Sequence, residues 1–167
     1  ALAAKVDGKV VDLTRPLTND ATVKFLGSDT QEGLDALRHS ASHIMAQAVQ
    51  HLFGDKVQFG IGPWIANGFY YDIDTEHTFV PEDLAKIEAE MEKIVKQDLP
   101  IVRQEMSREE AIRFFADKGQ QYKVELIQDL PADAVISLYT QGDFTDLCAG
   151  PHLPSTGRIK ALKLQSL

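Results

Sequence analysis

The stretch TQEGLDALRHSASHIMAQAVQHLFG, residues 30–54, decides the class of fold. We predict a helix over residues 30–53, capped at its start by Ser28 or Asp29 and ended by Gly54. It is the clearest helix of the sequence, and the segments after and before it are interpreted relative to it. Its apolar residues form one stripe at helical spacing: Leu34, Leu37, Ala41, Ile44, Met45, Ala48 and Leu52.

Beyond this helix, strands and helices follow in mixed order. Residues 56–74 combine alternating apolar positions with glycines, which indicates short strands around a glycine-rich loop. Further helices are predicted over residues 81–97 and from Ser107 to Gly119. Residues 122–127 are ambiguous between strand and helix. Mixed order without regular alternation indicates an α+β fold with a mixed or antiparallel sheet packed with helices. The remaining strands are predicted at residues 101–106, 134–139 and 159–164.

Before the central helix, residues 5–26 are typical of two or three short strands. Asp7-Gly8 is a hairpin turn signal. The apolar positions around this turn are too few for an independent core. We therefore divide the chain into a small β-rich domain, residues 1–28, and a main domain, residues 29–167.

The composition excludes several classes of protein. The chain has 167 residues and is 44% hydrophobic, enough for one sizeable domain or for one domain with a small appendage. Apolar runs are too short for a membrane helix, the start does not fit a signal peptide, and one cysteine excludes an internal disulfide framework. The net charge, 17 − 25 = −8, argues against a general nucleic-acid binder. We expect a cytoplasmic globular protein.

Two histidines of the central helix, His39 and His43, lie four residues apart and project from one face. On a helical wheel of about 100° per residue, they point away from the apolar stripe. The simplest interpretation is a solvated polar face, and a metal site is an alternative. The metalloprotease form of this spacing is excluded, because Ser40 stands where its glutamate is needed.

A second pair, Cys148 and His152, lies in a predicted loop rich in glycine and proline. Alone, it is most simply a buried thiol beside an unrelated histidine. Together the pairs offer three imidazoles and a thiol, which can bind zinc, position a water with acid and base groups, or form a Cys–His nucleophile. The residues leave these alternatives open, because 104 residues lie between His43 and Cys148. Asp146 can orient a histidine and Lys123 can stabilise an oxyanion, although both residue types are commonly solvated.

Four strings in this order add a more specific signal: RHSASH at 38–43, GIGP at 60–63, NGFYYD at 67–72 and DLCAGPHLP at 146–154. They resemble the N-terminal editing region of bacterial threonyl-tRNA synthetases, and the likeness runs over essentially the whole chain. The first 28 residues resemble the second half of the TGS domain of that family. One departure is Ala149, where many members carry arginine, the side chain that would support a contact to tRNA phosphate.

The resemblance implies hydrolysis of serine wrongly attached to threonine tRNA, with tRNA(Thr) carrying serine as the partner. It implies no required cofactor for editing, with zinc as an option, since the related editing domain of alanyl-tRNA synthetases is associated with zinc. ATP, the ligase's own zinc and homodimer contacts would belong to domains outside this sequence. A non-catalytic tRNA-docking appendage and a zinc-binding module are the alternatives. The implied pocket residues are His39, His43, Lys123, Asp146, Cys148 and His152; the zinc ligands would be His39, His43, Cys148 and His152.

Overall fold

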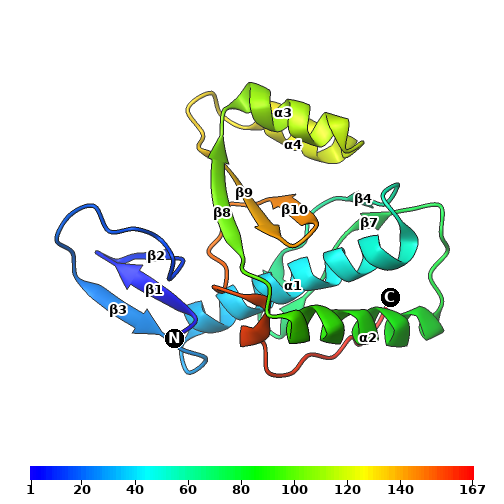
Figure 1. Cartoon of the computed structure of the whole chain (residues 1–167), viewed down its shortest axis with the longest axis horizontal. Helices are drawn as coiled ribbons and strands as arrows, with labels where there is room; N and C mark the ends of the chain where they lie inside the picture. The colour runs from blue at the N-terminus through cyan, green and yellow to red at the C-terminus, as the bar shows by residue number, and fades with distance from the viewer.

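A three-stranded antiparallel sheet forms the N-terminal end of the molecule (Figure 1). The computed structural model describes residues 1–167, and the sheet has the order β2-β1-β3. Asp7 and Gly8 form the turn between the first two strands with positive φ angles, a backbone conformation that glycine and aspartate tolerate better than most residues. The predicted hairpin is confirmed. The strands are β1 (Ala3–Val6), β2 (Lys9–Val11) and β3 (Val23–Leu26).

Helix α1 (Gln31–Phe53) crosses the centre of the molecule (Figure 1), as predicted. Its N-cap is Thr30 and not Ser28 or Asp29, so that detail of the prediction is wrong. The reason is a turn before the helix, in which both the N–H and the hydroxyl of Thr30 donate to the Gly27 carbonyl. The backbone therefore enters helical geometry only after Thr30.

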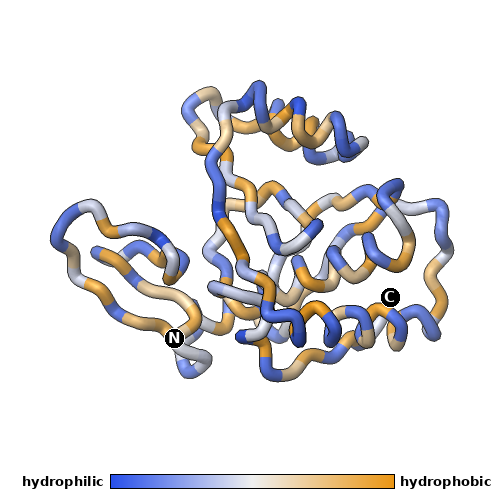
Figure 2. Tube along the Cα trace, viewed as in Figure 1, coloured by the Kyte–Doolittle hydropathy of each residue, from blue (hydrophilic) through white to orange (hydrophobic).

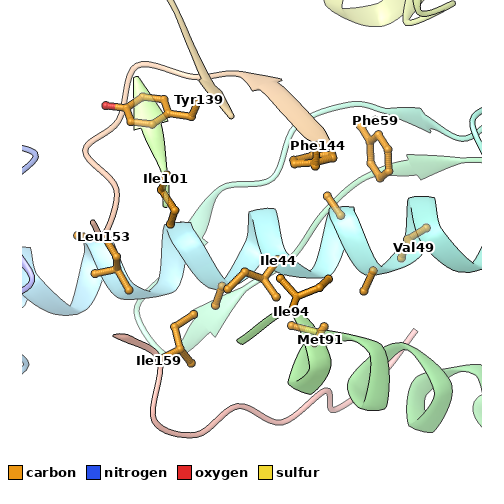
Figure 3. Close-up of a cluster of buried hydrophobic side chains, with 14 of the residues drawn as sticks. Ile44, Val49, Phe59, Met91, Ile94, Ile101, Tyr139, Phe144, Leu153 and Ile159 are labelled. Carbon is orange, nitrogen blue, oxygen red and sulfur yellow. The ribbon is translucent and has the colours of Figure 1, made fainter. Parts of the chain in front are cut away.

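The main core lies between α1 and α2 (Pro81–Gln97). Figure 2 shows hydrophobic and hydrophilic positions alternating along α2, as expected for a half-buried helix. Ala3 and Leu26 of the small sheet belong to the same core, so this sheet packs against the rest of the chain. The domain boundary after residue 28 stays a prediction. Figure 3 shows the core side chains, among them Ile44, Val49, Phe59, Met91, Ile94, Leu153 and Ile159.

A second antiparallel sheet, of order β10-β9-β8, lies beside a pair of short helices that cover a smaller core. Ser107 is the N-cap of helix α3 and forms the expected capping box with Glu110. The ambiguous residues 122–127 are helical, within α4, where Val124 and Ile127 are buried. The α+β prediction is confirmed. These elements are β8 (Val102–Met106), α3 (Arg108–Asp117), α4 (Gln121–Asp129), β9 (Ile136–Gln141) and β10 (Phe144–Leu147).

Four two-residue strands form two small ladders close to α1. Strand β4 pairs with β7 and β5 pairs with β6, which confirms short strands around a glycine-rich loop. They are β4 (Gln58–Phe59), β5 (Trp64–Ile65), β6 (Gly68–Phe69) and β7 (Ile73–Asp74).

The predicted strand at residues 159–164 is wrong. The 3-10 helix η1 (Thr156–Arg158) is followed by irregular chain that packs on α2, with the Lys163 ammonium and the Leu164 N–H both donating to Glu88. An alternating apolar pattern suits a strand, but this segment buries its apolar residues against a helix and pairs with no sheet edge. No helix in the structure has both the length and the apolar content that crossing a membrane requires.

Candidate active site

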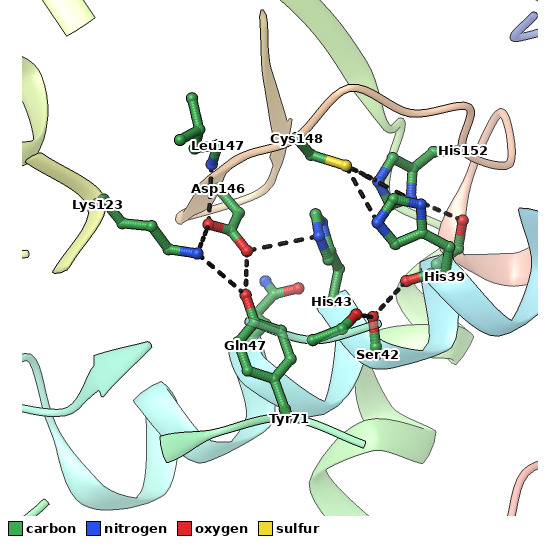
Figure 4. A network of polar contacts seen from close by, with 12 residues as sticks. His39, Ser42, His43, Gln47, Tyr71, Lys123, Asp146, Leu147, Cys148 and His152 are labelled. Atoms are coloured by element: carbon green, nitrogen blue, oxygen red, sulfur yellow. Dashed lines mark hydrogen bonds and ion pairs between the residues drawn. The ribbon is translucent and has the colours of Figure 1, made fainter. Parts of the chain in front are cut away.

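The two pairs of candidate residues meet on one side of α1 (Figure 4). His39 and His43 project from the middle of the helix, and Cys148 and His152 come from the loop that follows β10. Four potential ligand atoms, one from each residue, all lie within 4.8 Å of one another. The Cys148 Sγ lies 3.1 Å from His39 Nε2 and 3.2 Å from His152 Nε2. The fold thus joins segments that are more than a hundred residues apart.

The interpretation of His39 and His43 as a solvated face is wrong. His39 is 8% exposed and His43 is 3% exposed. The wheel correctly placed them opposite Ile44 and Ala48, but α1 is covered on both sides in the centre of the molecule. The loop after β10 and the β5–β6 hairpin cover the histidine face, and Trp64 lies with its ring centroid 4.9 Å from that of His39.

Lys123 and Asp146 lie beside the histidines and form a buried ion pair. The Lys123 ammonium is 2.8 Å from Asp146 Oδ1 and donates a second bond, also of 2.8 Å, to the Gly60 carbonyl. Asp146 Oδ2 is 3.5 Å from His43 Nε2. All six candidate residues therefore belong to one connected cluster.

Tyr71 is a member of this cluster that sequence reasoning missed. Its hydroxyl donates to Asp146 and lies 3.4 Å from the Lys123 ammonium. The string NGFYYD contains this residue, but aromatic side chains pack in cores more often than they serve sites, so the pattern alone does not single out its hydroxyl. Gly62 of the GIGP string makes room for the ring, because a Cβ at this position would lie 2.3 Å from a Tyr71 ring carbon.

Ser40 is the second member that sequence reasoning missed. In the sequence, Ser40 stands out only because it occupies the place of the metalloprotease glutamate. Its buried Oγ lies 2.9 Å from His152 Nδ1 and accepts the Leu153 N–H at 3.0 Å. Ser40 therefore holds the ring of His152 so that the other nitrogen, Nε2, faces Cys148.

The three histidines of the cluster are neutral at neutral pH. Burial lowers the pKa of His39 to about 3 and the pKa of His43 to about 4, although the Asp146 charge opposes the shift in both. Burial also holds the pKa of His152 well below its usual value. A buried cation costs free energy unless it is paired, which is why the imidazoles stay uncharged. Neutral imidazoles can accept a proton or bind a metal ion.

Cys148 and Asp146 differ in charge. Burial raises the pKa of the Cys148 thiol to about 12, so it is a neutral thiol. Burial alone would raise the pKa of Asp146, but Lys123, His43 and the bond from Tyr71 outweigh this effect and lower it. The carboxylate is therefore ionised and paired with Lys123. The Cys–His nucleophile is disfavoured, because the thiolate is the reactive form.

The donor set also fits zinc. Neutral imidazole nitrogen and cysteine sulfur are the ligand types that zinc prefers, and tetrahedral bond lengths place such ligand atoms roughly 3.3–3.6 Å apart. The contacts of 3.1 and 3.2 Å around Cys148 Sγ are close to that spacing. The bond between His152 and Ser40 resembles the outer contacts that orient metal-bound histidines. His39, His43, Cys148 and His152 would hold the ion.

In comparisons with known proteins, the family model and the relatives that match this chain all belong to tRNA synthetases. Residues 136–167 match the family described as "Threonyl and Alanyl tRNA synthetase second additional domain". Over all 167 residues, the chain is 58% identical to a threonine–tRNA ligase of Symbiobacterium thermophilum. The corresponding identities are 54% for the ligase of Syntrophomonas wolfei and 56% for that of Desulforamulus reducens. The chain spans about a quarter, 26%, of the length of each of these relatives.

Proposed function

Because this chain is homologous over its whole length to a region of bacterial threonine–tRNA ligases, we propose that it edits their errors by hydrolysing the ester between serine and threonine tRNA. The observation that carries the proposal is the cluster around α1. Three neutral imidazoles, a thiol and the Lys123–Asp146 ion pair lie together there. Such a set suits proton transfer during the attack of water on an ester. A cytoplasmic location, where tRNA is charged, follows from the same proposal.

A ligase for threonine needs such a second reaction. Serine has the same hydroxyl group as threonine and lacks only one methyl group. A site built for threonine rejects serine through that lost contact alone, which is worth about 1–3 kcal/mol. A separate hydrolytic pocket can correct the error if it accepts serine and excludes the extra methyl group of threonine.

His39 is the best placed of the three imidazoles to accept the proton of the attacking water. Each of the three rings has a nitrogen beside a protein group: His39 and His152 face Cys148, and His43 faces Asp146. The assignment to His39 therefore rests on its access to solvent. His39 is the most exposed of the three histidines. The water oxygen bonds to the ester carbon, and its proton passes to His39. The imidazolium then returns a proton to the 3′-oxygen of the tRNA as the carbon–oxygen bond breaks.

The other members of the cluster support the charge that develops. The ionised Asp146 stabilises a positive charge on the neighbouring imidazoles, as a carboxylate does when it is paired with a catalytic histidine. Lys123 keeps Asp146 ionised, and its ammonium already contacts Asp146, Gly60 and Tyr71. We therefore assign Lys123 to the support of Asp146 and not to direct contact with the ester.

The test is a deacylation assay with the purified chain. Serine attached to tRNA(Thr) should be released faster than in buffer, while threonine on the same tRNA stays largely intact. Low salt and a high concentration of the chain are appropriate, because its net charge of −8 limits phosphate contacts, which weaken further with salt. Equal hydrolysis of both esters would refute the discrimination.

Two variants on one helix make the assay specific. His39→Asn should lose most of the serine release. His51→Asn is the matched control, because His51 lies at the other end of α1 and contacts Glu90 and Asp143, outside the cluster. A folded wild-type chain that binds tRNA and hydrolyses neither ester would favour a docking module instead.

The zinc-binding alternative rests on the fit of the four donor residues. Metal analysis after dialysis and the same assay with a chelator separate the two proposals. We expect serine release to continue without bound metal, since proton transfer by neutral imidazoles needs none. Near-stoichiometric zinc together with loss of activity in chelator would reverse this assignment.

A further inference from the structure

Asp12 is a buried carboxylate that reaches the candidate site from the N-terminal segment. It follows β2 directly and is 5% exposed. Its Oδ1 accepts the backbone N–H of His152 at 2.7 Å, across 140 residues of sequence. Its Oδ2 accepts the hydroxyl of Tyr139 at 2.7 Å, across 127 residues. Both oxygens are therefore bound to groups next to the cluster, and neither bond lies within the N-terminal sheet.

Tyr139 extends this contact under the loop that carries Cys148 and His152. Its ring centroid is 4.5 Å from that of His152. Gly150 passes so close to it that a Cβ there would lie 2.1 Å from the Tyr139 hydroxyl oxygen. The Gly150 N–H donates to Cys148 Sγ at 3.2 Å. The position of the Tyr139 hydroxyl, which Asp12 fixes, thus limits where the whole loop can lie.

His152 is consequently held from two directions. Asp12 binds its backbone N–H, while Ser40 of α1 binds its ring Nδ1 at 2.9 Å. With the backbone and one ring nitrogen fixed, Nε2 can only point toward Cys148 and His39. Without Asp12, His152 itself would keep only the contacts of its ring, such as that with Ser40, and its buried N–H would lose its acceptor.

We propose that Asp12 is a positioning residue of the active site, so that the N-terminal segment completes this site and is not a separate appendage. The proposal rests on the proposed hydrolysis. It predicts a specific kind of defect: the reacting groups remain present, but the loop that carries two of them loses its fixed position. Small displacements of reacting groups reduce rates strongly, on the order of a hundredfold for 1 Å.

Asp12→Ala in the whole chain tests the proposal. We expect kcat for serine release to fall at least about tenfold with little change in KM, because Asp12 is buried and acts through the position of His152. Asp12→Asn should recover most of the rate, since the amide oxygen can still accept the His152 N–H. Tyr139→Phe should give an intermediate loss, because it removes one of the two bonds to Asp12.

Asp7 provides the matched control. It belongs to the same small sheet and also accepts a backbone N–H, that of Thr22 at 2.9 Å, but it contacts nothing near the cluster. Asp7→Ala should loosen the sheet and leave kcat unchanged. Equal losses in Asp7→Ala and Asp12→Ala would show that general loosening of the sheet, and not the bond to His152, causes the defect, and would overturn the proposal.

A readout without catalysis separates this proposal from the proposed function. Cys148 is the single cysteine, so its alkylation by iodoacetamide reports on the loop. Asp12→Ala should increase the alkylation rate several-fold over wild type, and Asp7→Ala should not. If the wild-type chain hydrolyses no ester, the proposed function fails while this comparison still decides the role of Asp12. Unchanged kcat or unchanged alkylation in folded Asp12→Ala overturns the positioning role. If Asp12→Ala does not fold, Tyr139→Phe decides by the same measurements.

Discussion

At the scale of single residues, Cys148 shows how burial changes the chemistry of a side chain. Its sulfur lies 3.1 Å from His39 and 3.2 Å from His152, an arrangement that often activates a thiol. Here the neighbouring imidazoles are neutral, and burial raises the pKa of the thiol to about 12. Cys148 therefore acts as a neutral hydrogen-bonding group between two histidines.

This assignment predicts that Cys148→Ser keeps a substantial part of serine release, within about tenfold of wild type, because a hydroxyl can make the same bonds. Cys148→Ala should lose most of it, since both histidines lose a partner. Initial rates of deacylation on folded samples measure the difference. If serine at this position were as inactive as alanine, the thiol itself would be required, and the nucleophile interpretation would return.

At the scale of elements, α1 carries His39, Ser40 and His43 of the cluster and also part of the main core, so its start must be fixed. The Thr30 side chain accepts the Gly33 N–H at 3.2 Å and donates to the Gly27 carbonyl at 2.8 Å. Gly33 has no room for a side chain, because a Cβ would lie 2.0 Å from the Gly27 oxygen. The turn before the helix and the first helical turn therefore hold each other.

From this contact we expect Thr30→Ala to lower the free energy of unfolding by about 1 kcal/mol, the usual cost of removing an N-cap side chain. Ser28→Ala is the control, because Ser28 caps nothing, and its effect should stay within about 0.5 kcal/mol. Urea denaturation of the three proteins provides the comparison. A larger loss in Ser28→Ala than in Thr30→Ala would contradict the capping assignment.

At the scale of the whole molecule, His51 connects three elements around the end of α1. One ring nitrogen is 2.9 Å from Glu90 of α2, and the other is 2.8 Å from Asp143 in the turn between β9 and β10. Burial would lower the pKa of His51, but the bonds to both carboxylates outweigh it and raise the pKa. The pKa values of Asp143 and Glu90 are lowered in turn. When it is protonated, His51 therefore joins α1 to α2 and to the β9–β10 turn through two charged hydrogen bonds.

Because the pKa of His51 is raised, the contribution of His51 to the free energy of unfolding should decrease as pH rises. A group with a raised pKa stabilises the folded state fully below its unfolded pKa of about 6.5, and the effect is lost as pH rises through the folded pKa. His51→Gln should therefore be less stable than wild type by up to about 1 kcal/mol near pH 5.5, and the difference should shrink toward pH 9. Thermal melts across this range measure it.

Lys93→Gln is the control for that comparison. Lys93 contacts the same carboxylate, Glu90, at 3.4 Å, but the pair contains no histidine. Its effect on stability should be small and nearly constant between pH 5.5 and pH 9. A His51→Gln difference that grows with rising pH would have the wrong sign and would refute the charged interaction.

The sequence by itself determined the elements whose signals are local. Helical spacing defined α1, Ser107 and Glu110 marked the start of α3, and Asp7-Gly8 marked the first hairpin. Each of these signals rests on contacts between residues a few positions apart, so the spacing of residues in the sequence is enough to predict the element. The family resemblance joined the two histidine-containing pairs, which spacing alone did not.

Tertiary structure decided everything that depends on distant neighbours. Burial of His39 and His43 requires a loop from the far end of the chain, and the helix in the ambiguous residues 122–127 is fixed by packing against α3. Residues 159–164 have a strand pattern but lie on a helix, because local alternation does not say which surface is available. Asp12 is the clearest case, since no local pattern shows that a carboxylate beside β2 binds the N–H of His152 across 140 residues. Charge, burial and position at the site are properties of the packed chain, and they appear only when its distant segments meet.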